Sequence, residues 1–351
     1  MKQIRLLQLT GLAVMLLSLA SCADKSANSS EFDSVQHYRS LMFSETPWDP
    51  IKGNFRLSEE ESQSINNYTL TYDEQERLVK VEYGRGDTLL DKSSLRAAKV
   101  VISYEENKEI RHYFNSKDSA ISVYGDVFKS VYEYSDGFKT GLKFYNKENE
   151  PTENWNKIGY YTWSRTPLGL IKENRYNLAD EEVVLNEFCP FYELRFTYDE
   201  NGYVTRMANY SEGVLYDCTA ENCGNIGVSY FEFKNDVNGN LLEFSVHSTT
   251  GQLSNLYWGW AKFSQSLDEN GYVVERVWYD QDDELRGGKE VPINQYKYDA
   301  FGSKIEERNL NASRELMNDS KGVAVKQFKY DEFGHEIETV SFDKDMNVVE
   351  S

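Results

Sequence analysis

The chain has 351 residues and carries 58 Asp and Glu against 38 Lys and Arg, a formal net charge of −20. A field of that sign repels phosphate backbones and anionic lipid headgroups, which argues against nucleic-acid binding and against electrostatic docking on membranes. With 25 Tyr and 18 Phe but only 6 Pro, the composition is typical of a folded β-protein and not of a disordered tail.

The N-terminal stretch MKQIRLLQLTGLAVMLLSLASC has the layout of a secretory signal. Two basic residues precede an apolar run, Leu6 to Leu19, that is too short to span a bilayer. The following Leu19-Ala20-Ser21-Cys22 resembles the lipobox of bacterial lipoproteins at all four positions. The resemblance implies a signal peptide over residues 1–21, lipidation of Cys22 and stable membrane anchoring by its acyl chains. Ala23, the next residue, implies an outer-membrane destination in the same way.

Residues 22–31 are small and polar, and we expect them to form a flexible tether. Over residues 32–43 the apolar positions recur at nearly helical spacing, and Ser30 is placed to cap them, which predicts a short helix over the open end of the following array. Pro47, Pro50 and Gly53 then indicate a loop. Residues 32–61 are therefore expected to be an N-terminal cap.

One pattern recurs through residues 62–351: two alternating, aromatic-rich runs flank a tight turn that ends in glycine. This is typical of a β-hairpin. The spacings of 31 to 37 residues indicate a repeat, and two earlier units without the glycine bring their number to about nine. We predict an all-β fold, an elongated antiparallel sheet of about nine stacked β-hairpins with a period of about 32 residues. The turn glycines are Gly137, Gly169, Gly202, Gly239, Gly271, Gly302 and Gly334.

The turns also predict which residues face each other. Asn-Gly pairs at 201–202, 238–239 and 270–271 favour a two-residue type I′ turn. Counting outward from such a turn, Tyr330 faces Ile337 on the core side, and Lys329 faces Glu338 on the opposite side. Each unit is expected to add a short third strand, because large or apolar residues recur eight and fourteen positions past the glycine.

A column of glutamates lies four residues past the turn glycines. Where a lysine stands opposite, as for Lys234, Lys297 and Lys329, a solvated cross-strand pair explains the glutamate better than a catalytic or metal-binding role. We therefore interpret the column as surface charge. Its members are Glu173, Glu243, Glu275, Glu306 and Glu338.

The run Tyr330-Asp331-Glu332-Phe333-Gly334, with a second acidic turn at 342–345, resembles the YD or RHS-like repeats of bacterial surface and secreted proteins. The resemblance covers most of residues 68–350, and MORN-like hairpin arrays share this kind of motif. It implies a twisted antiparallel sheet of hairpins and an extracytoplasmic role. The conserved core and C-terminal toxin of RHS proteins are not recognised here, so a toxin function is not expected.

No motif indicates a metal or a cofactor. The four histidines are far apart, and neither a zinc spacing nor a phosphate-binding glycine loop occurs. Two acidic runs, 280–284 and 343–347, resemble the start of a calcium loop without its position-six glycine or its helices, so we interpret them as turns and leave weak calcium binding open. The aromatic cluster of Tyr257, Trp258 and Trp260 suits sugar stacking if it is exposed and core packing if it is not; we favour the core.

Three cysteines remain after lipidation of Cys22. The envelope is oxidising, which predicts one disulfide and one leftover thiol. Cys218 and Cys223 lie in the longest unit and are the preferred pair. Cys189 with Cys223, across stacked units, is the alternative.

These patterns predict a lipid-anchored, non-enzymatic β-repeat protein of the outer membrane, facing either the periplasm or the cell exterior. It is expected to offer an extended surface to a protein or a glycan. An immunity-type or structural envelope lipoprotein is one alternative. A glycan-active enzyme is another, which the scattered carboxylates disfavour.

Overall fold

The computed structural model describes residues 33–349, except 92, 186–190, 217–227, 257 and 289. A single unit begins at Ser34. The signal peptide, the tether and Cys22 lie outside the described residues, as do all three cysteines of the disulfide prediction. Within the described ranges, no helix is long and apolar enough to cross a membrane.

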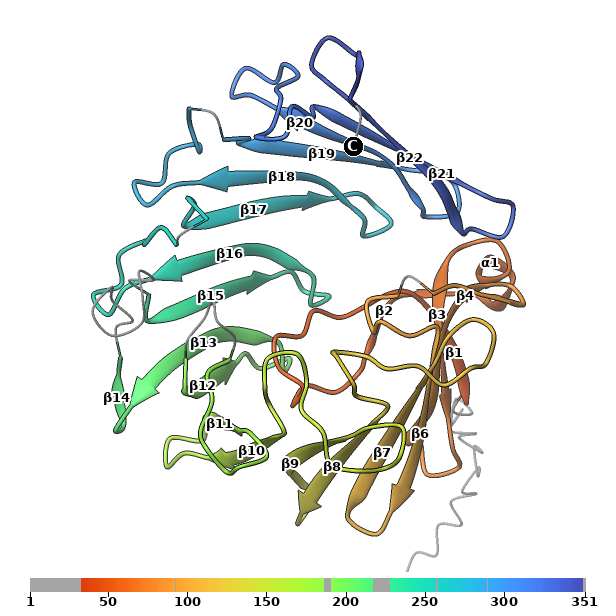
Figure 1. Cartoon of the computed structure of the whole chain (residues 1–351), viewed down its shortest axis with the longest axis vertical. Helices are drawn as coiled ribbons and strands as arrows, with labels where there is room; N and C mark the ends of the chain where they lie inside the picture. The colour runs from red at the N-terminus through yellow and green to blue at the C-terminus, as the bar shows by residue number, and fades with distance from the viewer. Residues whose placement is uncertain are drawn as a thin grey trace, which may run out of the picture. The chain divides into compact units, whose positions relative to one another are not determined.

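In the part of the chain that the structure describes, nine antiparallel hairpins follow one another from β3 to β22 (Figure 1). The second strand of each also pairs with the first strand of the next, so all belong to one open antiparallel sheet. The predicted all-β array of about nine hairpins is confirmed. The hairpins are β3 (Asn67–Tyr72) with β4 (Leu78–Arg85), β6 (Lys99–Glu105) with β7 (Lys108–Phe114), β8 (Lys129–Ser135) with β9 (Phe138–Tyr145), β10 (Tyr160–Arg165) with β11 (Ile171–Tyr176), β12 (Glu193–Tyr198) with β13 (Val204–Ser211), β15 (Tyr230–Asn235) with β16 (Leu241–His247), β17 (Lys262–Leu267) with β18 (Val273–Tyr279), β19 (Ile293–Tyr298) with β20 (Lys304–Leu310), and β21 (Val325–Tyr330) with β22 (Glu336–Phe342).

The expected third strand of the unit is present in a very short form. The two-residue strands β5 (Thr88–Leu89), β14 (Val214–Leu215) and β23 (Val348–Val349) fold back on β4, β13 and β22. In other units a single bridge replaces them. Four such bridges join the residues eight and fourteen positions past the glycine, as predicted: Tyr145 with Pro151, His247 with Leu253, Tyr279 with Leu285, and Leu310 with Leu316.

The three Asn-Gly turns and the turn of the last hairpin are not of the predicted type, whereas Asp136 and Gly137 between β8 and β9 both have positive φ, at 49° and 75°. In the last hairpin, the Gly334 amide donates to the Asp331 carbonyl over 3.1 Å, and the Asp331 amide donates to the His335 carbonyl over 2.9 Å. Only the glycine of this loop has positive φ, at 92°, which describes a three-residue loop with a left-handed glycine and not a type I′ turn. The Asp331 carboxylate favours this turn because its Oδ1 accepts the backbone amides of Phe333 and His335.

A β-bulge next to the turn corrects part of the predicted register. Tyr330 faces Glu336 and not Ile337, because the register shifts between Lys329 and Tyr330. Beyond the bulge the prediction is right, since Lys329 faces Glu338 with Nζ 2.6 Å from Oε2. Ile337 was predicted to be core but is 66% exposed. The equivalent pairs Lys297–Glu306 and Lys234–Glu243 also form.

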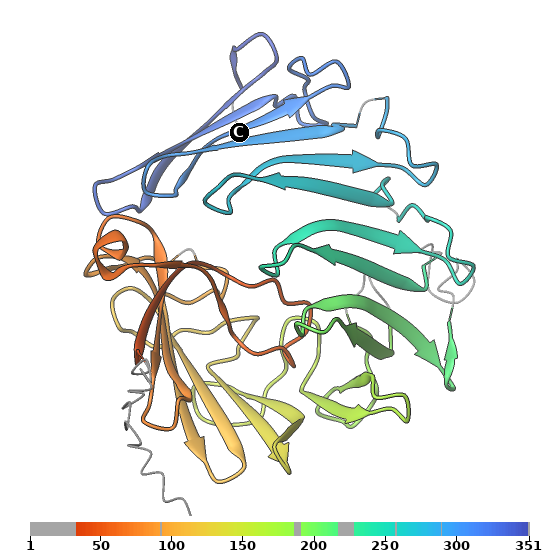
Figure 2. The ribbon, with the colours of Figure 1, turned by 180° about the vertical axis from the view of Figure 1, so that it is seen from behind.

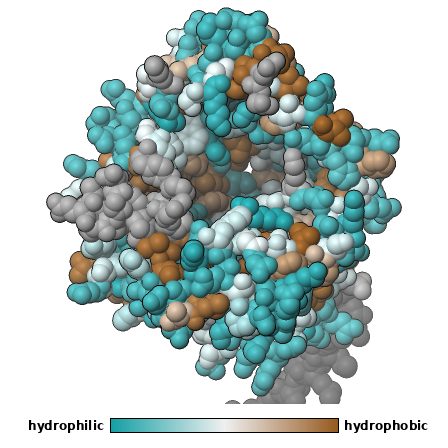
Figure 3. All heavy atoms as spheres, viewed as in Figure 1, coloured by the Kyte–Doolittle hydropathy of each residue, from teal (hydrophilic) through white to brown (hydrophobic). Residues whose placement is uncertain are grey.

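The hydrophobic core lies on the inner face of the sheet, which curls around it (Figures 1 and 2). On the face drawn in Figure 3 most residues are hydrophilic, and the surface is hollowed near its middle, where hydrophobic residues show at depth. The first strands of five hairpins contribute a column of buried residues to the core. Leu70, Trp163, Phe196 and Phe233 lie two positions before the end of their strands, and Tyr132 lies three positions before the end of β8.

The predicted helix over residues 32–43 is wrong. That segment forms β1 (Val35–Leu41), which pairs with β2 (Gly53–Leu57) on one side and β3 on the other. Hydrogen bonding to two strands overrides the helical spacing of its apolar residues. The helix found in the described part of the chain is a single turn, α1 (Glu59–Ser62), which begins with a capping box of Ser58 and Glu61.

Residues 42–52, which we call the strap, connect β1 to β2 and pass across the inside of the curled sheet (Figure 2). Phe43 packs on Phe233, and Trp48 packs between Phe138 and Tyr198, at centroid distances of 5.3 to 6.0 Å. The strap therefore joins hairpins that are far apart in sequence.

The late hairpins also return to the beginning of the chain. The Asn66 amide donates to the Phe301 carbonyl over 2.8 Å, and the Arg85 guanidinium lies 4.1 Å from the centre of the Phe301 ring. Figure 1 shows the same proximity, with β21 and β22 next to α1 and β4.

Candidate binding site

The glutamate column divides between the two faces of the sheet. Glu243, Glu306 and Glu338 pair with lysines, as predicted. Glu173 does not, and the interpretation of it as surface charge is wrong. Hairpin β10–β11 lacks the bulge, so Glu173 faces Trp163, and its side chain is only 1% exposed. A shift of one residue in register moves a side chain to the other face.

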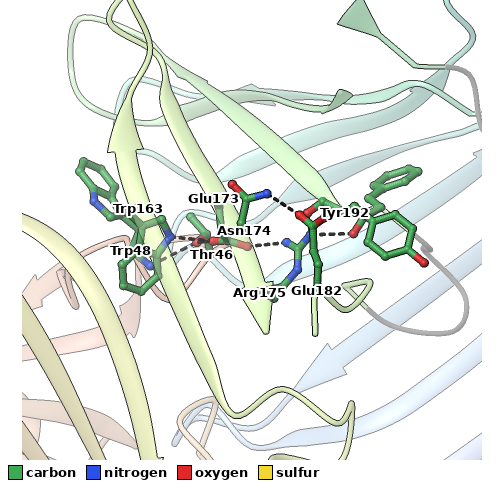
Figure 4. A network of polar contacts seen from close by, with 9 residues as sticks. Thr46, Trp48, Trp163, Glu173, Asn174, Arg175, Glu182 and Tyr192 are labelled. Carbon is green, nitrogen blue, oxygen red and sulfur yellow. Dashed lines mark hydrogen bonds and ion pairs between the residues drawn. The ribbon is translucent and has the colours of Figure 1, made fainter. Parts of the chain in front are cut away.

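Glu173 is the centre of a buried polar network (Figure 4). Its Oε2 accepts Trp163 Nε1 at 2.9 Å and Thr46 Oγ1 at 2.5 Å, and its Oε1 accepts Arg175 Nη1 at 2.7 Å. Arg175 is fully buried and also donates to the Phe191 carbonyl over 2.6 Å. Because Thr46 belongs to the strap, the network fastens the strap to the sheet.

Two further polar contacts hold the strap. Tyr198 donates its hydroxyl to Asp49 Oδ1 over 2.8 Å, and Lys139 Nζ donates to the Trp48 carbonyl over 2.8 Å. Burial, with a contribution from Arg111, lowers the pKa of Lys139 to about 7. Burial also raises the pKa of Asp49.

The half-buried Glu45 lies in the same part of the strap. Burial, together with the charges of Asp49 and Glu173, raises the pKa of its carboxyl to about 8. Glu45 is therefore mostly protonated at neutral pH. Sequence reasoning missed these carboxyls, because 44–50 read as a loop and nothing local places it against β11 and β12.

A cleft of about 650 Å³ opens between the strap and the inner face of the sheet. The cleft is lined by strands β6 to β10, by the strap, and by three connections around residues 94–96, 124 and 154–156, which we call its rim. The aromatic side chains that line it are Phe43, Tyr113, Tyr124, Tyr132, Phe144, Trp155 and Tyr161. A second cleft of about 390 Å³ shares the strap residues Pro50 and Ile51 with the first.

Arg96, Tyr124 and Trp155 form a group at the rim of the larger cleft, which we call the rim cluster. The two rings meet edge to face with centroids 5.8 Å apart, and the Arg96 guanidinium lies 4.6 Å from the Trp155 ring and 5.3 Å from the Tyr124 ring. Trp155 is 55% exposed. Its amide donates to the Tyr124 carbonyl over 2.9 Å, so the two connections that carry the rings hold each other in place.

The aromatic cluster singled out in the sequence is packed and lies away from this rim. Trp258 and Trp260 stack on each other at 4.9 Å, and Trp260 also contacts Phe244, Phe263 and Trp278. The core interpretation is confirmed for these two tryptophans, whereas Tyr257 lies outside the described residues.

The acidic turns use their carboxylates internally. Asp343 Oδ1 accepts the amides of Asp345 and Asn347, and Asp280 Oδ1 accepts those of Asp282 and Glu284. Across the described ranges, no group of three or more His, Cys, Asp or Glu side chains is placed to hold a metal ion.

No protein-family model matches the chain, and neither does any curated protein sequence. Among solved structures, it is similar to TcdB2-TccC3-Cdc42 at 10% identity and a TM-score of 0.29, over 80% of this chain and 14% of that one. The Photorhabdus luminescens Tc holotoxin pore gives 12% identity and a TM-score of 0.29, over 80% and 13%. A porin-like protein from Bacteroides uniformis gives 8% identity and a TM-score of 0.28, over 78% and 94%.

The chain spans only 14% of the first of these toxin chains. At such identities and TM-scores the similarity carries no argument about function. The β-repeat architecture rests on the strand pairings of this chain, and the site rests on its own side chains.

Proposed function

We propose that this chain is a lipid-anchored, non-enzymatic β-repeat protein of the bacterial outer membrane, and that it binds a glycan in the cleft between the strap and the sheet. The observation that carries the proposal is the rim cluster, which presents exposed aromatic rings at the mouth of a cleft lined by further rings. The proposal narrows the expected extended surface to one concave site.

The chemistry of the cleft suits a sugar. Ligand sites are concave and mostly apolar with a few placed polar groups, and volumes of about 300–1,000 Å³ are typical. Aromatic rings offer flat apolar faces on which the C–H face of a pyranose can stack. Asn154, Asn156 and Ser94 place polar side chains along the same cleft.

Two carboxyls near the cleft, those of Asp49 and Glu173, have a structural role in this proposal. Asp49 accepts a hydrogen bond from the Tyr198 hydroxyl. The Glu173 carboxylate accepts hydrogen bonds from Thr46, Trp163 and Arg175. These contacts attach the strap to the sheet, so the proposal assigns Asp49 and Glu173 to the scaffold of the binding site.

The binding proposal is tested with the mature full-length protein in detergent on a glycan array, followed by calorimetry on the glycans retained. Trp155→Ala should weaken binding by about 10-fold or more, because it removes the exposed stacking ring. Phe333→Ala is the matched control, since Phe333 is similarly exposed at 50% but lies in the turn of the last hairpin. Failure of every glycan to bind, or equal affinity of the Trp155→Ala variant, would refute the proposal.

The anchor is tested separately by fractionation and by mass spectrometry of the N-terminal peptide. We expect an acylated cysteine at Cys22 in the membrane fraction, and a soluble protein when Cys22→Ala is expressed. An unmodified N-terminus on the wild-type protein would refute lipidation without bearing on the cleft.

A further inference from the structure

We infer that the glycan taken by the cleft is acidic, and that the carboxylate of a uronic acid residue is held by the guanidinium of Arg96. The inference rests on the function proposed above and names the chemical class of its ligand.

The Arg96 guanidinium is held in place without using its hydrogen-bond donors. Its contacts are with the ring faces of Trp155 and Tyr124, at 4.6 and 5.3 Å, and such cation–π contacts leave the N–H groups free. Among the residues that the structure describes, no carboxylate forms an ion pair with Arg96, and no hydrogen bond from its side chain is formed. The guanidinium carries five N–H donors in a planar fork that matches a carboxylate.

A shortage of acidic residues does not explain this arrangement, because the chain has 58 of them against 38 basic ones. Two other arginines of the sheet show the contrast, because each forms an ion pair with a glutamate. Arg111, which also lines the cleft, lies 2.6 Å from Glu109, and Arg175 lies 2.7 Å from Glu173. Arg96 differs from these two in lying over exposed aromatic rings at the rim of the cleft, where it is open to an external anion.

The acidic residues that line the cleft belong to a different segment from Arg96. Glu45 and Asp49 belong to the strap, whereas Arg96 and Trp155 belong to the rim. Burial raises the pKa of Glu45 to about 8, so this carboxyl is mostly neutral at pH 7 and does not repel an acidic ligand there. The Asp49 carboxylate accepts a hydrogen bond from Tyr198.

A uronic acid engages both parts of the rim cluster at once. Its carboxylate is attached directly to the pyranose ring, so one residue of the glycan can stack on Trp155 while its carboxylate meets the fork of Arg96, which lies only 4.6 Å from that indole. This combination favours a carboxylate carried by a sugar over a free anion.

The test measures calorimetric affinities of the mature full-length protein for tetragalacturonate, a tetramer of glucuronate, and their methyl esters, which keep the rings and lose the charge. We expect the acid to bind about 10- to 100-fold more tightly than its ester. Arg96→Gln should remove this difference, and Arg96→Lys should restore it only in part because an ammonium has no fork. Arg77→Gln is the matched control, since Arg77 lies over the Tyr104 ring at 4.5 Å but lines neither cleft.

The outcomes separate the two proposals. Equal affinity for acid and ester, a preference for neutral or sulfated oligosaccharides, or an unchanged acid preference in Arg96→Gln would overturn the inference and leave glycan binding standing. Trp155→Ala should weaken acid and ester alike, which identifies the stacking contribution. Absence of binding to all neutral and acidic glycans would overturn both proposals.

Discussion

Replacing Glu173 with Gln should destabilise the protein far more than the same replacement at Glu243, although each lies four residues past a turn glycine. Glu173 is 1% exposed and pairs with Arg175, which is 0% exposed. Glu243 is 21% exposed, and its partner Lys234 is 72% exposed. Losing one partner of a buried ion pair costs about 3–5 kcal/mol, because the other charge stays buried and unpaired. An exposed pair is worth about 0–1 kcal/mol.

The measurement is equilibrium unfolding in urea, followed by circular dichroism for the sheet and by tryptophan fluorescence, since Trp163 donates directly to Glu173. Both signals are needed because repeat arrays can unfold in parts. Replacing both partners, Glu173→Leu with Arg175→Met, should recover much of the loss, since it removes the unpaired charge. Equal shifts for Glu173→Gln and Glu243→Gln would show that Glu173 does not face the interior.

Three further predictions concern the turn glycines, a hydrogen bond between neighbouring hairpins, and the pH dependence of stability. Gly271→Ala should lower the free energy of unfolding more than Gly169→Ala does. Both glycines have φ near +82°, so the left-handed backbone alone makes Gly169→Ala cost about 1–2 kcal/mol. An added Cβ at Gly271 would also lie 2.0 Å from the Phe55 ring, whereas one at Gly169 would meet nothing. Equal unfolding midpoints would contradict this. Tyr298→Phe should cost about 1 kcal/mol in unfolding free energy, because its hydroxyl donates over 3.0 Å to a carbonyl of the preceding hairpin; an unchanged midpoint would show that this bond adds nothing. The pKa of Lys139 is about 7 in the folded protein and 10.5 in its ordinary state. Between these pH values the unfolded chain binds more protons than the folded one, so the free energy of unfolding should rise with pH. The rise should reach up to about 5 kcal/mol relative to Lys139→Met. Parallel pH profiles of the two proteins would refute this.

The sequence by itself determined the repeat. The spacing of the turn glycines and the alternation of side chains give the nine hairpins, and the same logic correctly places Lys329 opposite Glu338. Both features are local, because about fifteen consecutive residues form a hairpin. The order of these residues determines the turn type and which side chains alternate between the two faces. The fold class, the short third strands and the core position of Trp260 follow from this local sequence pattern.

The tertiary structure decided the site. Glu173 occupies the same sequence position as Glu243, and only the absence of a bulge in its hairpin turns it inward. The strap looked like an ordinary loop, and its role depends on contacts such as Thr46 to Glu173, 127 residues away. Arg96 and Trp155 lie in connections of different hairpins and meet only because the sheet stacks and curls. Bulges and long-range packing depend on how the whole sheet closes on its interior, and no single segment of the chain encodes that.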